Sequence, residues 1–477
     1  MSVSHVSGPQ LARLLGGPPR GRPVYRGLAR AVRALVEDGR IAVHTRLPAE
    51  RDLAAVLGLS RTTVTAAYDR LRDQGYLESR QGAGSWTALP PPGGADAAAG
   101  DRAPGAAEVI DLGRATPGAP VVFDAAVAAA VAALPRHSGR PGYEPAGVPE
   151  LREAIAARYA ERGVPTRPDQ IVVTTGAQSA LGILAGTLLE PGAPVMVERP
   201  AYPHAPAAFL ARAARIVPAG VNDGWDPELI GCGMRQAAAR AAYLIPDFQN
   251  PTGLLMPDGV RSALAHEARA NDTVLIADET FAELALDPAA PMPPPLAAHD
   301  ARDRVISVGS ASKLMWGGLR IGWIRATAPL ARRIAAGRES GDMGSPVLEQ
   351  LIVCALLDRL EEVRAERAAH LAAGRDALAA ALRDRLPGWD FRLPEGGMAL
   401  WARLEAPVAS QLAEAAERHG VRVAPGPAFG AEGVLEDYVR LPYVLPPATL
   451  RTAVDRLADA HAEVMAAPFT RPQVPYV

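Results

Sequence analysis

The larger part of this chain alternates short apolar runs, which show no polar alternation, with alanine-rich helical stretches. Such runs suit strands of a parallel sheet that is covered by helices on both faces, because neither face of the strand then meets water. The predicted strands are Ile171–Thr174, Pro194–Val197, Ala242–Ile245, Thr273–Ala277 and Val305–Val308, with Ile321–Ile324 as a further, weaker candidate. The pattern therefore predicts an α/β domain with a large, mostly parallel sheet.

Composition and periodicity divide the 477-residue chain further. The stretch from Ala88 to Ala107 is dominated by Pro, Gly and Ala and predicts a linker. After Pro346 long helices dominate, with strand candidates around 398–404, 421–424 and 438–441, which predicts a smaller α+β subdomain. The predicted boundaries are 1–22 (N-terminal extension), 23–88 (small N-terminal domain), 89–108 (linker), 109–345 (large domain, whose N-terminal segment is shared with the small subdomain), 346–465 (small subdomain) and 466–477 (tail).

Charge is distributed unevenly between these parts. Residues 1–88 hold 13 arginines against 7 acidic residues, whereas the remainder holds 37 basic and 45 acidic residues. This asymmetry suggests that only the N-terminal part meets a polyanion. The two cysteines, Cys232 and Cys354, lie far apart and imply neither a disulfide framework nor a metal site. With no transmembrane-length apolar stretch and no signal-peptide pattern, we expect a cytoplasmic protein.

The N-terminal part has the pattern of a helix-turn-helix domain. Helical spacing predicts a first helix over 24–36, a second after Pro48 and a third that starts near Ser60 and ends at Gly75. The side chains expected to face inward are Leu53, Val56, Leu57, Val64, Tyr68 and Leu71. Those expected outside, at the start of the third helix, are Arg61, Thr62, Thr63 and Thr65. A hairpin over 76–86 would form a wing; a generic three-helix domain with a solvated basic face remains an alternative.

The segment LPAERDLAAVLGLSRTTVTAAYDRLRDQGYLESRQGAGSWTA resembles the winged-helix domain of GntR-type bacterial regulators, and the match covers nearly all of residues 23–88. The resemblance implies that double-stranded promoter DNA is a partner. It further implies that the DNA contacts come from Arg51, from Arg61, Thr62 and Thr63 on the recognition helix, and from Arg80 and Gly82 in the wing.

The chain contains one lysine, Lys313, although arginine is abundant. Arginine can replace lysine as a surface charge, but its guanidinium stays protonated and cannot form a Schiff base with an aldehyde. Lys313 follows the apolar run at 305–308, within Ser310-Ala311-Ser312-Lys313, which is a poor place for a stray surface charge. We therefore predict that Lys313 forms the Schiff base with pyridoxal 5'-phosphate.

Pyridoxal phosphate also needs a carboxylate for its ring nitrogen and a donor for its phenolic oxygen. Asp278, at the end of a predicted strand, would point into the usual ligand crevice of an α/β sheet, although an Asp that caps the next helix is a fair alternative. Asn250 could donate to the phenolic oxygen, with an ordinary Asn-Pro turn as its alternative. Tyr202 could stack on the ring or be a buried structural tyrosine.

The phosphate has candidate partners in two segments. Gly176, Ala177 and Gln178 follow a predicted strand and open a helix, so their backbone N–H groups could face an anion. Ser310 and Ser312 add hydroxyls, and Arg320 adds a fixed charge.

In this order, the set resembles fold-type I pyridoxal phosphate enzymes of the aspartate aminotransferase class, over about residues 110–465. The resemblance implies that Tyr143 reaches the phosphate of the other subunit in a dimer and that Arg440 grips the carboxylate of an amino-acid ligand. A GntR-type domain joined to such a body resembles the MocR family of transcriptional regulators. That family resemblance implies a head-to-tail homodimer whose DNA binding responds to the cofactor or to an amino compound.

One segment departs from the family pattern. A tyrosine that donates to the phenolic oxygen is expected shortly after the ring-nitrogen Asp, but this chain has Thr280 and Phe281 there. The departure puts efficient transamination in more doubt than cofactor binding. We therefore expect a regulator that senses pyridoxal phosphate or an amino compound. The alternatives are an active aminotransferase that carries a DNA-binding domain and, ranked lower, a regulator whose body only dimerises.

Overall fold

A computed structural model describes residues 5–15, 24–37, 41, 45–73, 75–80, 84–88, 109–301, 303–430 and 434–466. The chain divides into two compact units, Met1–Ala107 and Glu108–Val477. The predicted linker at 89–108 and the tail beyond Ala466 lie almost wholly outside the described residues. Within the described parts, no helix combines the length and the apolar character that crossing a membrane requires.

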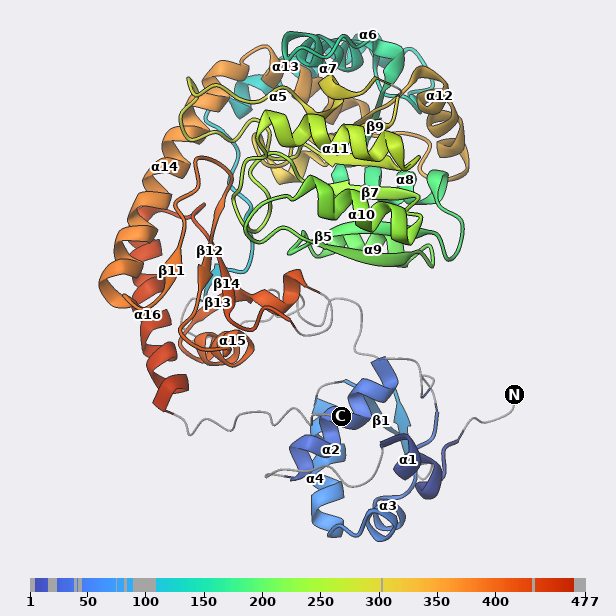
Figure 1. Cartoon of the computed structure of the whole chain (residues 1–477), viewed down its shortest axis with the longest axis vertical. Coiled ribbons are helices and arrows are strands. Elements are labelled where there is room, and N and C mark those ends of the chain that lie inside the picture. The colour runs from blue at the N-terminus through green and yellow to red at the C-terminus, as the bar shows by residue number, and fades with distance from the viewer. Residues whose placement is uncertain are drawn as a thin grey trace. The chain divides into compact units, whose positions relative to one another are not determined.

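The first unit is a small helical domain with a hairpin (Figure 1). Its elements are α1 (Gly8–Leu15), α2 (Val24–Glu37), α3 (Glu50–Leu57), α4 (Arg61–Asp73), β1 (Leu77–Arg80) and β2 (Gly84–Thr87). The predicted turn is present, because Gly58 has a φ of 66° and ends α3, and Ser60 Oγ accepts from the Thr63 N–H at 3.1 Å. The three helices and the hairpin predicted from the sequence are thus confirmed.

Two details of this unit differ from the prediction. Val56 was expected to face inward but is 43% exposed, whereas Leu53 and Leu57 are buried. Helix α1 lies within the predicted N-terminal extension and yet belongs to the core, because Leu11 is fully buried in the same cluster as Leu28. Helical spacing places three apolar residues on α3, but only the packing of α1 and α4 decides which of them is covered.

The second unit contains a seven-stranded sheet with the order β4-β10-β9-β8-β7-β5-β6. Its strands are β4 (Ile171–Thr174), β5 (Pro194–Arg199), β6 (Arg215–Gly220), β7 (Ala241–Leu244), β8 (Val274–Asp278), β9 (Val305–Ser310) and β10 (Gly322–Arg325). All neighbouring strands run parallel except β10, which is antiparallel to both β4 and β9. The predicted, mostly parallel sheet is confirmed, and β6 is an additional edge strand.

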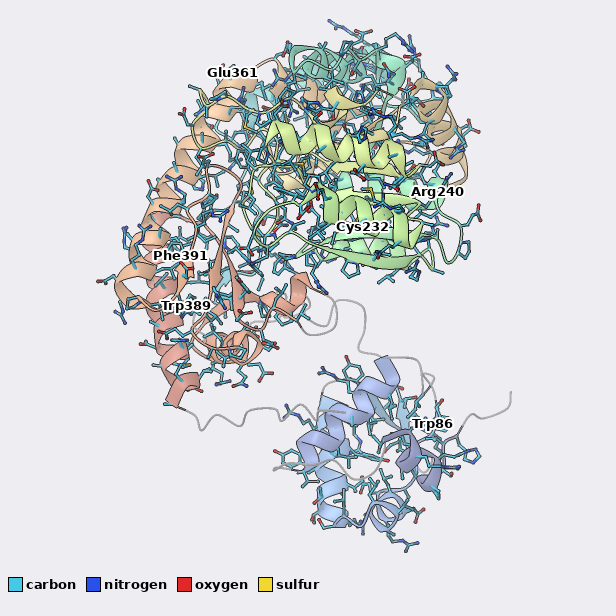
Figure 2. All side chains as sticks on the ribbon, in the orientation of Figure 1. Trp86, Cys232, Arg240, Glu361, Trp389 and Phe391 are labelled. Carbon is cyan, nitrogen blue, oxygen red and sulfur yellow. The ribbon has the colours of Figure 1, made fainter. Side chains whose placement is uncertain are left out.

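Helices cover both faces of this sheet (Figure 1). One face packs against α8 (Ala177–Leu188), α9 (His204–Leu210) and α12 (Ala328–Gly337). The other packs against α7 (Pro149–Glu161), α10 (Pro227–Ala237), α11 (Asp258–Ala270) and α13 (Val347–Leu357), with α5 (Phe123–Ala133) and the short α6 (Pro135–Ser138) beyond them. The two cysteines, Cys232 on α10 (Figure 2) and Cys354 on α13, are both free. Strands buried on both faces explain why their sequences show no polar alternation.

A second sheet has the order β11-β12-β14-β13-β3. Its strands are β3 (Ile110–Leu112), β11 (Asp390–Phe391), β12 (Ala399–Arg403), β13 (Val421–Pro425) and β14 (Tyr438–Pro442). It is accompanied by α14 (Leu360–Arg385), α15 (Ala409–Arg418) and α16 (Pro447–Ala466). Strand β3 comes from the start of the unit and runs parallel to β13, so the N-terminal segment completes the C-terminal sheet.

Candidate functional site

Lys313 lies three residues beyond the end of β9, where the chain turns away from the sheet. Its Nζ donates to the carbonyl of Ala115 at 2.9 Å and lies 6.0 Å from the ring centroid of Phe281. Burial and, to a smaller extent, nearby Arg440 lower the pKa of Lys313 to about 8, although the carboxylate of Asp278 opposes the shift. The neutral fraction of this amine near physiological pH is therefore much larger than that of an ordinary lysine, although most of the amine is still protonated, and the neutral form is the nucleophile.

Asp278 ends β8 and is buried beside this amine. Tyr243 on β7 donates its hydroxyl to Oδ2 at 2.6 Å, and Oδ1 accepts from both the backbone N–H (2.9 Å) and the hydroxyl of Thr280. Burial raises the pKa of Asp278, whereas these donors and Lys313 favour the ionised form. No helix follows the carboxylate, so the alternative of a helix cap is wrong for Asp278.

Asn250 and Arg440 meet from the two sheets of the unit. Arg440 on β14 places Nη1 3.4 Å from the Asn250 Oδ1, and its guanidinium lies 4.9 Å from the Phe429 ring centroid. Arg440 is only 7% exposed, and burial lowers its pKa to about 10. Its Nε is buried and has no hydrogen-bond partner among the described residues. A buried cation with an unused donor is suited to a carboxylate ligand.

A further carboxylate, Glu198, supports the loop that carries Asn250 and was missed by the sequence analysis. It accepts from the indole of Trp225 (2.7 Å), the N–H of Ile245 (3.0 Å) and the amide of Gln249 (3.0 Å). Burial raises the pKa of Glu198 to about 7, although these donors oppose the rise. Its partners come from distant parts of the chain, so no local sequence pattern could have identified it.

The predicted phosphate partners converge at the start of α8. Gly176 has a φ of 82°, and a Cβ at this position would lie 2.6 Å from Nη2 of Arg320. Arg320 donates to the Thr175 carbonyl at 3.2 Å, and the Ser312 N–H donates to Ser310 Oγ at 3.1 Å. Gln178 instead donates to the His204 carbonyl at 3.0 Å. Only glycine allows the guanidinium this close to the first turn of the helix.

The aromatic candidates differ in their surroundings. Tyr202 is half-buried with its ring 5.2 Å from that of His204, and burial and Asp278 raise its pKa. Tyr143 is 65% exposed. Phe281 lies beside Lys313, while the hydroxyl of Thr280 turns back to Asp278, so neither donates to the space next to the lysine. The roles of Tyr202 and Tyr143 towards a cofactor stay predictions.

These residues fit the requirements of pyridoxal phosphate. The unit brings together a reactive amine, a buried carboxylate, a side-chain amide and a helix N-terminus with an arginine. They come from the ends of β8 and β9, from the loop after β7, from the turn between β4 and α8 and from the segment just before β10. The carboxyl ends of parallel strands form the usual ligand crevice of an open α/β sheet.

In the first unit, the predicted recognition helix is α4. Arg61 and Thr62 are exposed at its N-terminus, and Thr63 is half-buried with its hydroxyl 2.7 Å from Ser60 Oγ. Thr65, expected outside, is half-buried and donates to Glu50 at 2.8 Å. The helix therefore presents a narrower polar face than predicted.

The remaining predicted DNA contacts lie on α3 and in the hairpin. Arg51 on α3 has a side chain that is 86% exposed. Arg80 pairs with Gly84 across the hairpin, but its side chain and Gly82 lie outside the described residues.

Both units match known families. Residues 109–457 match the model of aminotransferase class I and II, and residues 24–86 match that of bacterial regulatory proteins, gntR family. Among solved structures, the α-aminoadipate aminotransferase LysN of Thermus thermophilus, complexed with N-(5'-phosphopyridoxyl)-L-leucine, has a TM-score of 0.68 at 29% identity, covering 75% of this chain and 93% of that one. The kynurenine aminotransferase of Pyrococcus horikoshii has a TM-score of 0.70 at 26% identity, covering 78% and 97%.

Two relatives share both units with this chain. The probable rhizopine catabolism regulatory protein MocR of Rhizobium meliloti is 30% identical over 84% of this chain and 86% of its own length. The HTH-type transcriptional regulator YdcR of Escherichia coli is 30% identical over 85% and 92%. The chain therefore belongs to the aminotransferase class I and II family and, within it, to the MocR-type regulators, which join a GntR-type DNA-binding domain to an aminotransferase-like body.

Proposed function

We propose that this protein is a DNA-binding transcriptional regulator whose body binds pyridoxal phosphate and responds to an amino compound. The proposal rests on two features that occur together in one chain. Helix α4 begins with an exposed Arg-Thr pair at Arg61, and the chain's one lysine is buried among the candidate cofactor-binding residues, which form the cofactor cradle. Neither feature by itself distinguishes a regulator from an enzyme, but their combination in one chain favours the regulator.

In this proposal the cradle residues hold the cofactor by its separate groups. Lys313 binds the aldehyde, Asp278 the ring nitrogen and Asn250 the phenolic oxygen. The first turn of α8, with Ser310, Ser312 and Arg320, binds the phosphate. When bound, pyridoxal phosphate supplies an aldehyde that reacts reversibly with amines. The three donors on Asp278 orient its carboxylate and favour the ionised form, which opposes the effect of burial on its pKa.

Arg440 would recognise the carboxylate of the incoming amino compound. Its Nε has no hydrogen-bond partner among the residues that the structure describes, and its guanidinium is already held against Phe429, so little side-chain entropy is lost on binding. A ligand that engaged Arg440 on the small sheet and Lys313 on the large domain would bias the arrangement of the two. Such a bias is what a sensor requires, provided that the ligand prefers one arrangement.

Two further parts of the proposal concern the assembly. The family resemblance implies a head-to-tail homodimer, in which Tyr143, which is exposed here, would reach the partner's phosphate site. Arg51, Arg61, Thr62 and Thr63, with Arg80 and Gly82 of the wing, would contact promoter DNA. Two copies of the domain would suit two half-sites on the same face of the duplex.

An active aminotransferase is the second candidate, and the relatedness to a 2-aminoadipate transaminase of Thermus thermophilus, 32% identical over 65% of this chain, favours it. Phe281 beside Lys313 opposes it, because a phenyl ring cannot donate the hydrogen bond that a tyrosine would supply. Steady-state turnover with amino acids and 2-oxo acids separates the two candidates.

The proposal is tested with purified full-length protein and pyridoxal phosphate. We expect a visible absorbance band that borohydride converts into a cofactor permanently attached to the peptide containing Lys313, as mass spectrometry will show. Lys313→Arg keeps the charge and should lose the attachment while the protein still binds DNA. A wild-type protein without the band, or a band that persists in Lys313→Arg, would contradict the proposal. Promoter binding should then change when amino acids are added to the wild type but not to the variant.

A further inference from the structure

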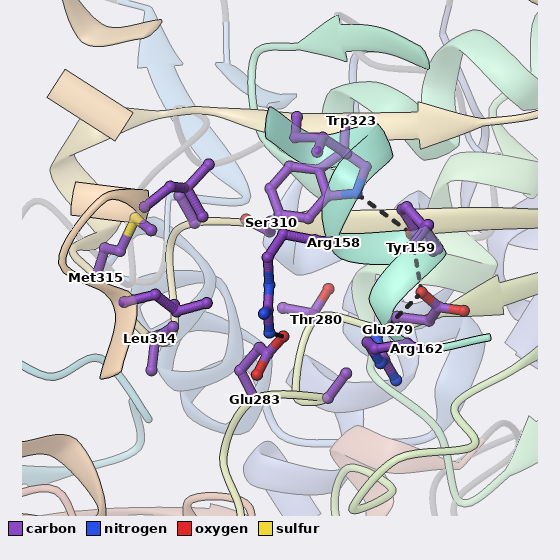
Figure 3. Close-up of a pocket in the computed structure, with 15 residues that line it drawn as sticks. Arg158, Tyr159, Arg162, Glu279, Thr280, Glu283, Ser310, Leu314, Met315 and Trp323 are labelled. Carbon is purple, nitrogen blue, oxygen red and sulfur yellow. Dashed lines mark hydrogen bonds and ion pairs between the residues drawn. The ribbon is translucent and has the colours of Figure 1, made fainter. Parts of the chain in front are cut away.

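A second enclosed space lies next to the cofactor cradle, on the α7 face of the large sheet (Figure 3). It has a volume of about 60 Å³ and shares only Ser310 with the predicted cradle residues. One water needs roughly 10–15 Å³ by the same measure, so the cavity has room for a ring-sized molecule. Neither Lys313 nor Asp278 lines it, and the proposed function leaves it unused.

One wall of the cavity is apolar. Ile155 comes from α7, Leu314 and Met315 follow Lys313, and Leu357 and Leu360 lie at the junction of two helices. In Figure 3, Leu314 and Met315 lie across the space from Tyr159 and Glu279. This wall offers contacts to an apolar body and nothing to a charge.

The opposite wall is polar, but its groups are already paired with each other. Arg158 binds Glu283 at 2.9 Å, and the hydroxyl of Tyr159 donates to Glu279 at 2.8 Å while accepting from the Trp323 indole at 3.3 Å. The dashed lines in Figure 3 follow these contacts.

The charges that line the cavity also balance, because the cations Arg158 and Arg162 face the anions Glu279 and Glu283. Nη2 of Arg162 makes no hydrogen bond in the described part of the chain, but it lies 4.0 Å from Oδ2 of Asp247, a carboxylate that does not line the cavity. Water would find few free partners here, and a charged ligand would find no counter-charge.

We propose that this cavity is a second ligand site, which takes a small uncharged molecule with an apolar ring-sized body and at most one hydroxyl or carbonyl group. The apolar wall binds the body. Arg162, whose Nη2 has an ion-pair contact with Asp247 but makes no hydrogen bond to a described residue, can donate to one acceptor. The pairing of the other polar groups excludes carboxylates and amines from the site.

An occupant would touch parts of the chain that hold the cofactor residues. Thr280 lines the cavity and donates to Asp278. Leu314 and Met315 directly follow Lys313, and Arg367 of α14 donates to both of their carbonyls at 3.0 Å. The same arginine donates to the Gly118 carbonyl at 2.8 Å. Arg367 therefore links α14 both to the turn after Lys313 and to the segment at Gly118.

The cavity also lies at the junction between α13 and α14. Helix α13 ends at Leu357 and packs on α5 and α7 of the large domain, whereas α14 begins at Leu360 and packs on α16 beside the small sheet. A molecule between these two residues and the Lys313 turn would favour one angle of the junction. Binding of this molecule would therefore change the affinity of the protein for pyridoxal phosphate, and binding of pyridoxal phosphate would change the affinity for the molecule by the same factor. This coupling rests on the proposed function.

The site is tested with benzyl alcohol and benzoate, which share a ring and differ in charge, on cofactor-free full-length protein. We expect saturable binding of benzyl alcohol by ligand-observed NMR and a rise in the melting temperature of the body, and benzoate should compete for this site at least about tenfold less well. No saturable binding of benzyl alcohol, or its displacement by an equal concentration of benzoate, would overturn the proposed site.

Variants localise the probe. Ala282→Leu fills part of the cavity and should weaken benzyl alcohol binding by about tenfold or more, whereas Ala157→Leu, on the exposed side of α7, should not. If Ala282→Leu does not fold, Leu360→Ala enlarges the same cavity and should strengthen binding of the probe. If benzyl alcohol binds both cavity variants as it binds the wild type, the probe binds elsewhere and the proposal is wrong.

Coupling is measured by titrating pyridoxal phosphate with and without saturating benzyl alcohol. We expect the dissociation constant of the cofactor to change by about fivefold or more. An unchanged constant overturns the coupling. A protein that binds benzyl alcohol but no cofactor at all would overturn the proposed function instead and leave the second site standing.

Discussion

The two units of this chain use cationic side chains in opposite surroundings. Arg51 and Arg61 of the first unit are exposed, whereas Lys313 and Arg440 of the second are enclosed and have lowered pKa values. Exposed cations suit a phosphate backbone, which presents many charges and tolerates water. Enclosed cations suit one aldehyde or one carboxylate, because burial tunes their protonation and excludes competing water. The body therefore relies on cations whose pKa is lowered by burial, whereas the first unit relies on exposed cations.

The largest effect is expected at Glu198, the buried carboxylate behind Asn250. Its pKa of about 7 lies above the ordinary value of 4.5, so its contribution to stability is fully present below about pH 4.5 and is lost as the pH rises through 7. Between pH 5 and 8 the wild type should lose about 3 kcal/mol of unfolding free energy through this group, and Glu198→Gln should not show this loss. Urea unfolding of the body at both pH values measures this.

A companion variant sharpens this test. Trp225→Phe removes one donor to Glu198, so the pKa of the carboxyl should rise further and the loss of stability should extend to higher pH. If Glu198→Gln has the same pH slope as the wild type, the carboxylate is not the buried titrating group described here.

The second effect concerns the amine of Lys313. Because its pKa is about 8, the neutral fraction at pH 6 is about 100-fold below its plateau, and the rate of covalent cofactor attachment should fall in the same proportion. Arg440→Gln removes a cation that lowers this pKa, so the rate profile should move to higher pH. Arg440→Lys, which keeps the charge, is the control. Stopped-flow absorbance measures the rates. Identical rate profiles for the wild type and both variants would contradict the claim that buried Arg440 lowers the pKa of Lys313.

The third effect concerns the exposed side. Arg61→Ala should cost about 1–3 kcal/mol in binding to the specific promoter if the guanidinium contacts a base edge. Arg70→Ala, exposed near the C-terminus of the same helix, serves as the matched control and should cost less. Fluorescence anisotropy with specific and random duplexes measures both variants. An equal loss on both duplexes would make Arg61 a phosphate contact.

The smallest effect is expected for Arg51. If this side chain neutralises one phosphate, Arg51→Ala should make the slope of log affinity against log salt shallower by about 1, without changing sequence preference. A salt series of the same anisotropy assay tests this. An unchanged slope would remove Arg51 from the DNA-contacting set.

Sequence pattern predicted the elements better than their surroundings. Strands buried on both faces were recognisable from uninterrupted apolar runs. Strand β6 was not, because Pro218 interrupts it and because it lies at the sheet edge, where half of its residues are exposed. Helical spacing identified α3 yet placed Val56 on the wrong side. Periodicity reports that a face is apolar, whereas neighbouring elements decide how much of that face is covered.

The candidate site shows the same division. Lys313, Asp278 and Asn250 could be identified because each has a distinctive residue type at a recognisable place after a strand. Glu198 could not, because its meaning depends on donors from three other segments. The sequence left open which of Thr280 and Phe281 replaces the tyrosine. The structure answers this, because Thr280 turns to Asp278 and Phe281 lies beside the amine.

Residue order alone thus determines the two-part architecture, the class of cofactor and the lysine, because periodicity, a lone residue type and strand-end motifs are local properties. Only folding decides the lowered pKa of Lys313, the support of Asn250 by Glu198 and the cavity beside the cradle, in which the charges of the lining residues balance. Burial, and the donors and charges that surround a group, come from segments far apart in the chain. Their effect on protonation and ligand choice exists only after those segments have packed together.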